Sequence, residues 1–192
     1  MAKQTYTATT KDGAWTTLVT GEATVASLII NATVETTLVS LRLTLANGTS
    51  SYILPLNTLP FNSPNRLAIG GISLKVGDKL EALSNAAVDW VTTTITGIAY
   101  KSNITTSPGT GAWTNLVSGP CTVRGLFVST PSAGTAGIRL KKAASEASIV
   151  LSEELKVGGS KRLMIPIVLA AGDSLQVQGS GQAYWIATGV EV

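Results

Sequence analysis

Apolar and polar residues alternate with a period of two along much of the chain. In the segments 39–45 and 162–169, an apolar residue occupies every odd position. Successive side chains of a β-strand point to opposite faces of a sheet, so this alternation predicts strands with one buried face. Turn sequences separate the runs: ANGT at 46–49, VGD at 76–78, AAGD at 170–173 and GSGQ at 179–182.

No segment has a convincing helical pattern. The nearest one is ASEASIVLSEELK at 144–156, which aligns with GTSSYILPLNTLP at 48–60. The second of these segments contains two prolines, which interrupt a helix. We therefore interpret both segments as strand and loop.

One sequence pattern occurs twice. DGAWTTLVTGEATV at 12–25 matches TGAWTNLVSGPCTV at 110–123, and further blocks match in the same order up to the closing segments at 88–97 and 183–192. This order predicts two copies of one fold, residues 1–101 and 102–192, each with about seven or eight short strands. The predicted fold class is all-β, with two tandem, duplicated antiparallel β-sandwich domains of jelly-roll or immunoglobulin-like type.

Pro166 interrupts one of the alternating runs. Because proline has no N–H to donate to a neighbouring strand, we predict that this strand lies at a sheet edge or carries a bulge at Pro166. An edge strand of this kind can pair with another subunit.

The composition is poor in charge. Charged residues make up 13% of the chain, about half the usual share for a soluble domain, whereas 44% of the residues are hydrophobic. A weakly charged surface suits a protein that resides in an assembly. The net charge of +3 is spread along the chain, with dense basic clusters only at 141–142 and 161–162, and this distribution argues against nucleic acid as a partner.

The N-terminal residues MAKQTYTATT lack the apolar stretch of a secretory signal, and no segment approaches the roughly 18 apolar residues of a membrane span. Cys121 is the one cysteine, so the chain cannot form an internal disulfide. We expect the chain to fold in a reducing cytoplasm and to have no membrane partner.

The residues needed for common catalytic chemistry are scarce. The chain contains no histidine, which removes the commonest general base and metal ligand. Asp78 and Asp173 are the best candidates for a carboxylate pair, because both copies have them. A Gly-Asp sequence between two strands is, however, typical of a turn whose carboxylate accepts backbone N–H bonds, and we interpret both residues as turn residues. We expect no catalytic residue, no cofactor, no metal and no enzymatic activity.

The four tryptophans form two matched pairs, Trp15 with Trp90 and Trp113 with Trp185. An exposed tryptophan can stack on a sugar or a base. Pairs that keep their relation to the same strands in a duplicated fold are more typical of a core, where each ring can bury about 200 Å². We interpret all four as structural core, with sugar binding as the alternative.

The two copies differ most around LPLNTLPFNSPN at 54–65. This proline-rich segment contains Leu59, Pro60, Phe61 and Pro64, and it cannot join a sheet along its whole length. An apolar loop of this kind either folds back on its own domain or docks on a partner, and both alternatives stay open. We take these four residues as a candidate partner-contact loop.

The segments WTTLVTGEATVASLIIN and ISLKVGDKLEAL…WVTTTITGIAY resemble accessory structural proteins of tailed bacteriophage particles. These are small β-sandwich proteins that decorate the capsid or form part of the collar, tail or fibre apparatus. The shared pattern is a Trp-Leu opening strand, a Thr-Val strand, an Arg-Leu strand, an L-x-x-G-D-x-L hairpin and a closing Trp strand. It covers nearly the whole chain, twice.

The resemblance implies a non-enzymatic virion protein that folds in the host cytoplasm before assembly. We expect a capsid decoration, or cement, protein that binds the major capsid protein or other virion proteins, forms homo-oligomers and stabilises the assembled head. Two linked domains suit this role, because they reach neighbouring sites at a high effective concentration. The alternatives are a collar, tail, baseplate or fibre component, which includes a module that binds a receptor glycan, and a glycan-degrading enzyme.

Overall fold

A computed structural model of the protein describes residues 2–32, 34, 37–59, 65–67, 71–96, 100–143, 146–164 and 166–191, and for residues 59, 65–67 and 146–153 it describes the backbone alone. The chain divides into two compact units, Met1–Tyr100 and Lys101–Val192, next to the boundary expected from the repeat. Within the described ranges, every regular element is a β-strand.

The strands of the first unit are β1 (Lys3–Thr10), β2 (Thr16–Thr20), β3 (Ala23–Ala32), β4 (Thr37–Thr44), β5 (Ser50–Leu59), β6 (Asn65–Leu67), β7 (Ser73–Leu74), β8 (Lys79–Ser84) and β9 (Val88–Ile95). One sheet has the order β1-β9-β3-β6, with β7 also paired to β3, and the other has the order β2-β8-β4-β5. All of these pairs are antiparallel.

The strands of the second unit are β10 (Lys101–Pro108), β11 (Thr114–Ser118), β12 (Cys121–Val123), β13 (Gly125–Ser129), β14 (Gly134–Lys141), β15 (Glu146–Leu155), β16 (Ser160–Leu163), β17 (Ile167–Leu169), β18 (Ser174–Gly179) and β19 (Gln182–Val190). They form the sheets β10-β19-β13-β16 and β11-β18-β14-β15, and β12 pairs with β17.

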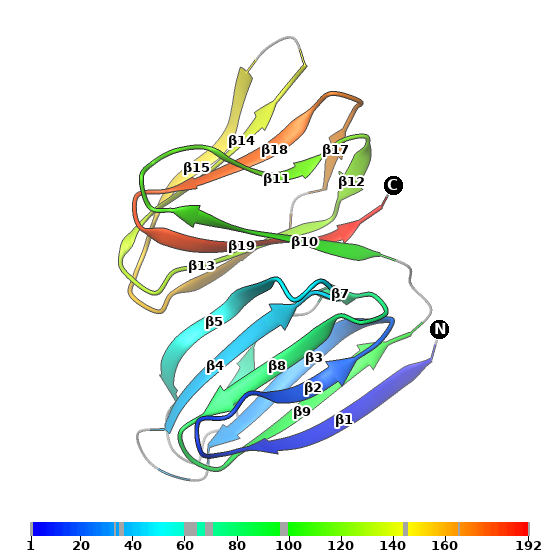
Figure 1. The fold of residues 1–192 in the computed structure, drawn as a ribbon, viewed down its shortest axis with the longest axis vertical. Coiled ribbons are helices and arrows are strands. Elements are labelled where there is room, and N and C mark those ends of the chain that lie inside the picture. The colour runs from blue at the N-terminus through cyan, green and yellow to red at the C-terminus, as the bar shows by residue number, and fades with distance from the viewer. Residues whose placement is uncertain are drawn as a thin grey trace. The chain divides into compact units, whose positions relative to one another are not determined.

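The two units have the same topology. Their strand orders correspond position by position when β12 and β13 together are taken as the counterpart of β3, and β17 as that of β7 (Figure 1). Two antiparallel sheets between which the strands are exchanged in this order form a jelly roll. The all-β sandwich fold predicted from the alternation is confirmed, and the strand order identifies the jelly-roll type.

The run around Pro166 is divided between two strands. β16 pairs with β13 and β17 pairs with β12, and Pro166 lies in the connection between them with its side chain exposed. The strand predicted to run through Pro166 is therefore interrupted at this residue, and the predicted edge position is found in its first half, β16. Proline cannot donate to a ladder, and in this fold the chain leaves one sheet there and enters the other strand pair. β16 does form the last strand of its sheet.

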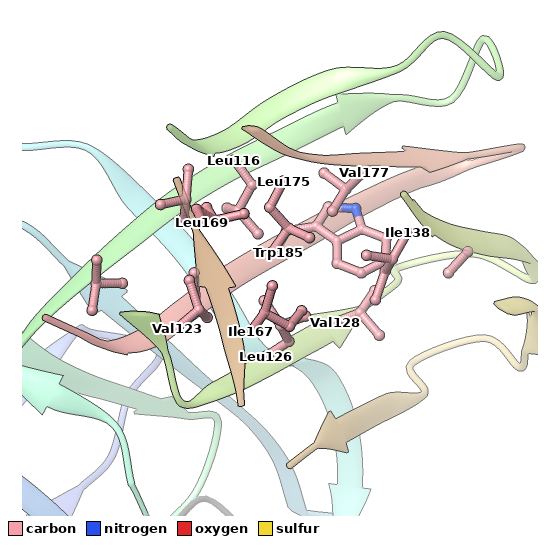
Figure 2. Packing of buried hydrophobic residues seen from close by; sticks show 14 of the residues in the cluster. Leu116, Val123, Leu126, Val128, Ile138, Ile167, Leu169, Leu175, Val177 and Trp185 are labelled. Carbon is pink, nitrogen blue, oxygen red and sulfur yellow. The ribbon is translucent and has the colours of Figure 1, made fainter. Parts of the chain in front are cut away.

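The core of the second unit lies between its two sheets and surrounds Trp185 (Figure 2). The indole Nε1–H points to the hydroxyl of Ser107, 3.4 Å away, so the one polar atom of this buried ring has a partner. The same buried cluster includes Leu116, Val123, Leu126, Val128, Ile138, Ile167, Leu169, Leu175 and Val177.

Trp90 has the equivalent place in the first unit. Its side chain is buried, and its Nε1–H donates to the hydroxyl of Thr10 at 2.7 Å. Trp15 and Trp113 are different, because both are only half-buried and each precedes the strand that follows it. The prediction that both belong to the core is therefore wrong. Each of the two rings stacks on an arginine side chain instead.

The two aspartates at equivalent positions of the two units hold backbone turns, and both are buried. In the first unit the carboxylate of Asp78 accepts the N–H of Lys75 at 2.9 Å, within its own turn, and the N–H of Ala46 at 2.9 Å, from the turn after β4. In the second unit Asp173 accepts the corresponding N–H groups of Ala170 and Ala143, at 3.1 and 3.3 Å. Each aspartate thus joins two neighbouring turns, whereas the sequence indicated one.

We expect Asp78→Ala to destabilise the first unit by about 2 kcal/mol, because it leaves two N–H groups without their acceptor. Asp78→Asn keeps a single carbonyl oxygen and should cost less. Hydrogen exchange of core amides measures the effect in the full chain, with the amides of the second unit as the internal control. An Asp78→Ala variant within about 0.5 kcal/mol of the wild type would contradict this role.

Asp173 makes the second unit sensitive to acid. A hydrogen bond from the ammonium group of Lys142, at 2.9 Å, outweighs the effect of burial, and together with the two backbone N–H groups it lowers the pKa of Asp173. A carboxylate with a lowered pKa stabilises the folded state above its unfolded pKa of about 3.9, and the contribution is lost as the pH falls through the lowered value. The stability difference between the wild type and Asp173→Asn should therefore shrink from about pH 5 downwards. Urea unfolding at a series of pH values measures it, and a difference independent of pH would exclude this linkage.

Candidate interaction surfaces

The outer face of the sheet β2-β8-β4-β5 carries a cluster around Trp15. The guanidinium of Arg42, which projects outwards between two buried leucines of β4, lies 4.0 Å from the centroid of the Trp15 ring. Its Nε lies 2.9 Å from Oε2 of Glu81 on β8, and the hydroxyl of Thr44 donates to the same oxygen at 2.6 Å. The ring of Tyr52 on β5 lies 6.0 Å from that of Trp15, at an angle of 54°.

The two opposite charges of this cluster, on Arg42 and Glu81, form an ion pair. Burial acts to raise the pKa of Glu81, but the hydrogen bonds from Thr44 and Arg42 and the charges of Arg42 and Lys79 outweigh it, and the pKa is lowered. Trp15 therefore packs on an arginine that has a carboxylate partner. A cation–π contact of this kind contributes about 1 kcal/mol or less at a partly exposed site, and it explains why the ring stays on the outer face.

The second unit repeats the stack but changes the partner of the arginine. Arg139 lies 4.5 Å from the centroid of the Trp113 ring, and its Nε donates to Oε1 of Gln176 at 2.8 Å. Arg139 pairs with Gln176 across the sheet in the same register in which Arg42 pairs with Glu81. An amide thus stands at the position of the carboxylate.

A second amide follows two residues further along β18. Gln178 pairs with Gly137, whereas the equivalent pair in the first unit is Leu83 with Ser40. A Cβ atom at Gly137 would lie 3.0 Å from Cγ and from Nε2 of Gln178, so the glutamine side chain lies close against the glycine backbone. The alternation in SLQVQ at 174–178 is sufficient to put both glutamines on one face of a strand. Their position beside Trp113 depends on how β18 pairs with its neighbours, which the sequence alone does not give.

A cleft of about 470 Å³ opens near the start of β14. A volume of this size lies within the range typical of small-ligand sites. Its lining includes hydroxyl groups, one carboxylate, one ammonium group and some apolar surface. The lining residues are Ala133, Gly134, Thr135, Glu154, Leu155, Lys156 and Ser180.

A strip of exposed apolar side chains lies at the connection between β16 and β17; it consists of Met164, Pro166 and Val168. The side chain of Met164 is 62% exposed and that of Val168 is 71% exposed. The sequence analysis missed this strip, although the run 162–169 already contained it: three of its four outward positions, 164, 166 and 168, are apolar. Of the other exposed apolar side chains, Val76 and Val157 lie in turns, whereas Ile29 lies in β3 and Leu56 in β5.

The candidate partner-contact loop lies almost entirely outside the described residues. Pro60, Phe61 and Pro64 are not described, and Leu59 is described only through its backbone, which pairs with Thr37 at the end of β5. Whether this loop contacts a partner stays a prediction.

The described residues contain no group of three or more side chains suited to hold a metal ion. Burial raises the pKa of the Cys121 thiol, although the charge of Lys101 opposes this, and a raised pKa disfavours the nucleophilic thiolate. None of the described segments is a helix of the length and apolarity required to cross a membrane.

No protein-family model matches the chain, and no curated protein matches it at a significant level. Among solved structures, the major capsid protein P2 of bacteriophage PM2 aligns over 100% of this chain and 98% of its own, with 7% identity and a TM-score of 0.47. HutD from Pseudomonas fluorescens aligns over 99% and 80%, with 10% identity and a TM-score of 0.32. A conserved protein of unknown function from Pseudomonas aeruginosa aligns over 99% and 98%, with 9% identity and a TM-score of 0.31. Scores this low do not establish a shared fold, and the jelly-roll assignment depends on the strand order alone.

Proposed function

We propose that the chain is a non-enzymatic structural protein of a bacteriophage particle, and that it acts as a decoration protein on the assembled head. Its partner is the major capsid protein or another virion protein. Copies that bind to equivalent sites of a symmetric shell meet one another as homo-oligomers, after each has folded in the host cytoplasm.

The observation that carries this proposal is the apolar strip of Met164, Pro166 and Val168. Large exposed apolar side chains in a group mark surfaces that a partner covers. The strip also borders unprotected strand edges, because β16 is the last strand of its sheet and, among the described strands, β17 pairs with β12 alone. A partner can therefore bury the side chains and pair with the backbone at the same place.

A decoration protein stabilises a shell by binding its assembled form and not its free subunits. Burial of one valine or methionine side chain contributes about 1.5–3 kcal/mol, so a strip of this size supplies only part of a stable interface. Two linked units raise the effective concentration at a second site, and a weak contact repeated in this way becomes a stable one.

The scarcity of catalytic groups supports a non-enzymatic role. The chain has no histidine, its single thiol is buried with a raised pKa, and both repeated aspartates are engaged by backbone N–H groups. Histidine is thus absent, the thiol is disfavoured as a nucleophile, and the two repeated aspartates are engaged in turns.

A binding experiment tests the proposal and the strip together. The purified chain is mixed with preformed empty capsids of the phage that encodes it, and the bound fraction is measured by co-sedimentation. We expect the wild type to bind and Val168→Asp to bind at least about tenfold more weakly, because a carboxylate replaces a buried apolar contact. Val76→Asp is the matched control, because Val76 is 73% exposed and Val168 is 71% exposed.

Circular dichroism shows whether each variant is folded. Failure of the folded wild type to bind capsids would exclude the decoration role. Equal binding by the Val168→Asp and Val76→Asp variants would exclude the strip as the contact surface.

A second candidate is a collar, tail, baseplate or fibre component. The half-buried Trp15 and Trp113, on outer faces and not in the core, favour this alternative, because a receptor-binding protein presents aromatic rings to its ligand. Electron cryomicroscopy of the intact particle distinguishes the two candidates by the position of the chain, on the head or at the tail.

A further inference from the structure

The two units share a scaffold, so the residues that differ on it are informative. Both units stack an arginine on a tryptophan, and this common contact has a structural role in each. Around the stack, the first unit places a carboxylate and a leucine at the positions where the second unit places Gln176 and Gln178. The second unit has therefore exchanged an internally paired, partly apolar face for one that presents two amides.

These groups lie on one face of the sheet. Ala136 and Ile138 of β14 belong to the core, so Thr135, Gly137 and Arg139 point to the opposite side. In the same way, the two glutamines of β18 point away from the core, because Leu175 and Val177 lie within it.

Gly137 lies in the middle of this row and is buried. It contributes no side chain, and Gln178 lies against its backbone with Cγ and Nε2 near the place of the missing Cβ. Trp113 and Arg139 stand at one end of the row, and the 470 Å³ cleft begins at the other end with Thr135. Four residues of an extended strand span about 13 Å, which gives the row the length of a short oligosaccharide.

We propose that this face of β14 and β18, from Trp113 through Gln176 and Gln178 to the cleft at Thr135, binds a neutral oligosaccharide. Each glutamine amide carries both donors and an acceptor, which matches adjacent sugar hydroxyls that donate and accept. Trp113 is only half-buried, and the part of its indole that Arg139 leaves uncovered offers an apolar surface to the C–H groups of a sugar ring. The hydroxyl groups of Thr135 and Ser180 add further polar contacts at the cleft.

The same face does not suit a protein partner. Of the described side chains in the second unit, the large exposed apolar ones are Val157, Met164 and Val168, and none belongs to β14 or β18. The oligosaccharide surface is thus separate from the apolar strip. The inference goes beyond the decoration role, and it holds for a chain on the head or at the tail.

The test uses the full chain on an array of neutral oligosaccharides of two to six sugars, followed by calorimetric titration of the strongest ligand. We expect binding by the wild type and a loss of at least about tenfold in affinity for Gln178→Leu, which introduces the residue of the first unit at this position. Gly137→Ser, which likewise copies the first unit, should displace Gln178 and weaken binding in the same direction.

Two controls make the result specific. Trp113→Ala should abolish binding, whereas Trp15→Ala, the equivalent change in the first unit, should leave it intact, with circular dichroism as the check that both variants fold. The Gln178→Leu variant should still sediment with capsids, so failure here is distinguishable from failure of the decoration role. Absence of binding to every neutral oligosaccharide, binding of anionic glycans only, or an equal loss in the Trp15→Ala variant would each overturn the proposal.

Discussion

A β-strand can send only every second side chain between two facing sheets, and the structure of each unit depends on this constraint. The inward positions must be apolar and must fill the space around one tryptophan, Trp90 in the first unit and Trp185 in the second. The outward positions carry no such requirement. Function in this protein is therefore to be sought on outer faces, at strand ends and in loops, where a change of side chain leaves the packing of the core unaltered.

The alternation, the repeat and the absence of helical patterning were sufficient to predict two all-β sandwich units from the sequence. They could not distinguish a jelly roll from an immunoglobulin-like fold, because that choice depends on which distant strands pair. The pairing of β1 with β9 joins residues from opposite ends of the first unit, and no local pattern reports it. The division of the run at Pro166 has the same origin, since its two halves pair with different strands.

The tryptophans show how far a matched pattern can mislead. Trp15 and Trp113 recur at equivalent points because each stacks on an arginine, and this contact is retained on an outer face as consistently as a core contact is retained inside. The period-two pattern within the strands distinguishes the core tryptophans from those on an outer face. Trp90 lies in phase with buried residues of β9, whereas Trp15 lies before the first residue of β2 and has no phase to read. The glutamines of β18 were visible in the alternation, but their position beside Trp113 follows only from the register.

Two units of the same topology allow one chain to keep a scaffold and vary a surface. In the second unit the apolar strip belongs to β16 and β17, whose partners are β13 and β12, and the amide-bearing face belongs to β14 and β18 in the other sheet. Outer faces of opposite sheets in a sandwich point in opposite directions. The strip and the row from Trp113 to the two glutamines therefore share no residue and lie on different strands. The two proposals, attachment to a particle and binding of a sugar, thus do not exclude each other, because neither surface needs a residue of the other.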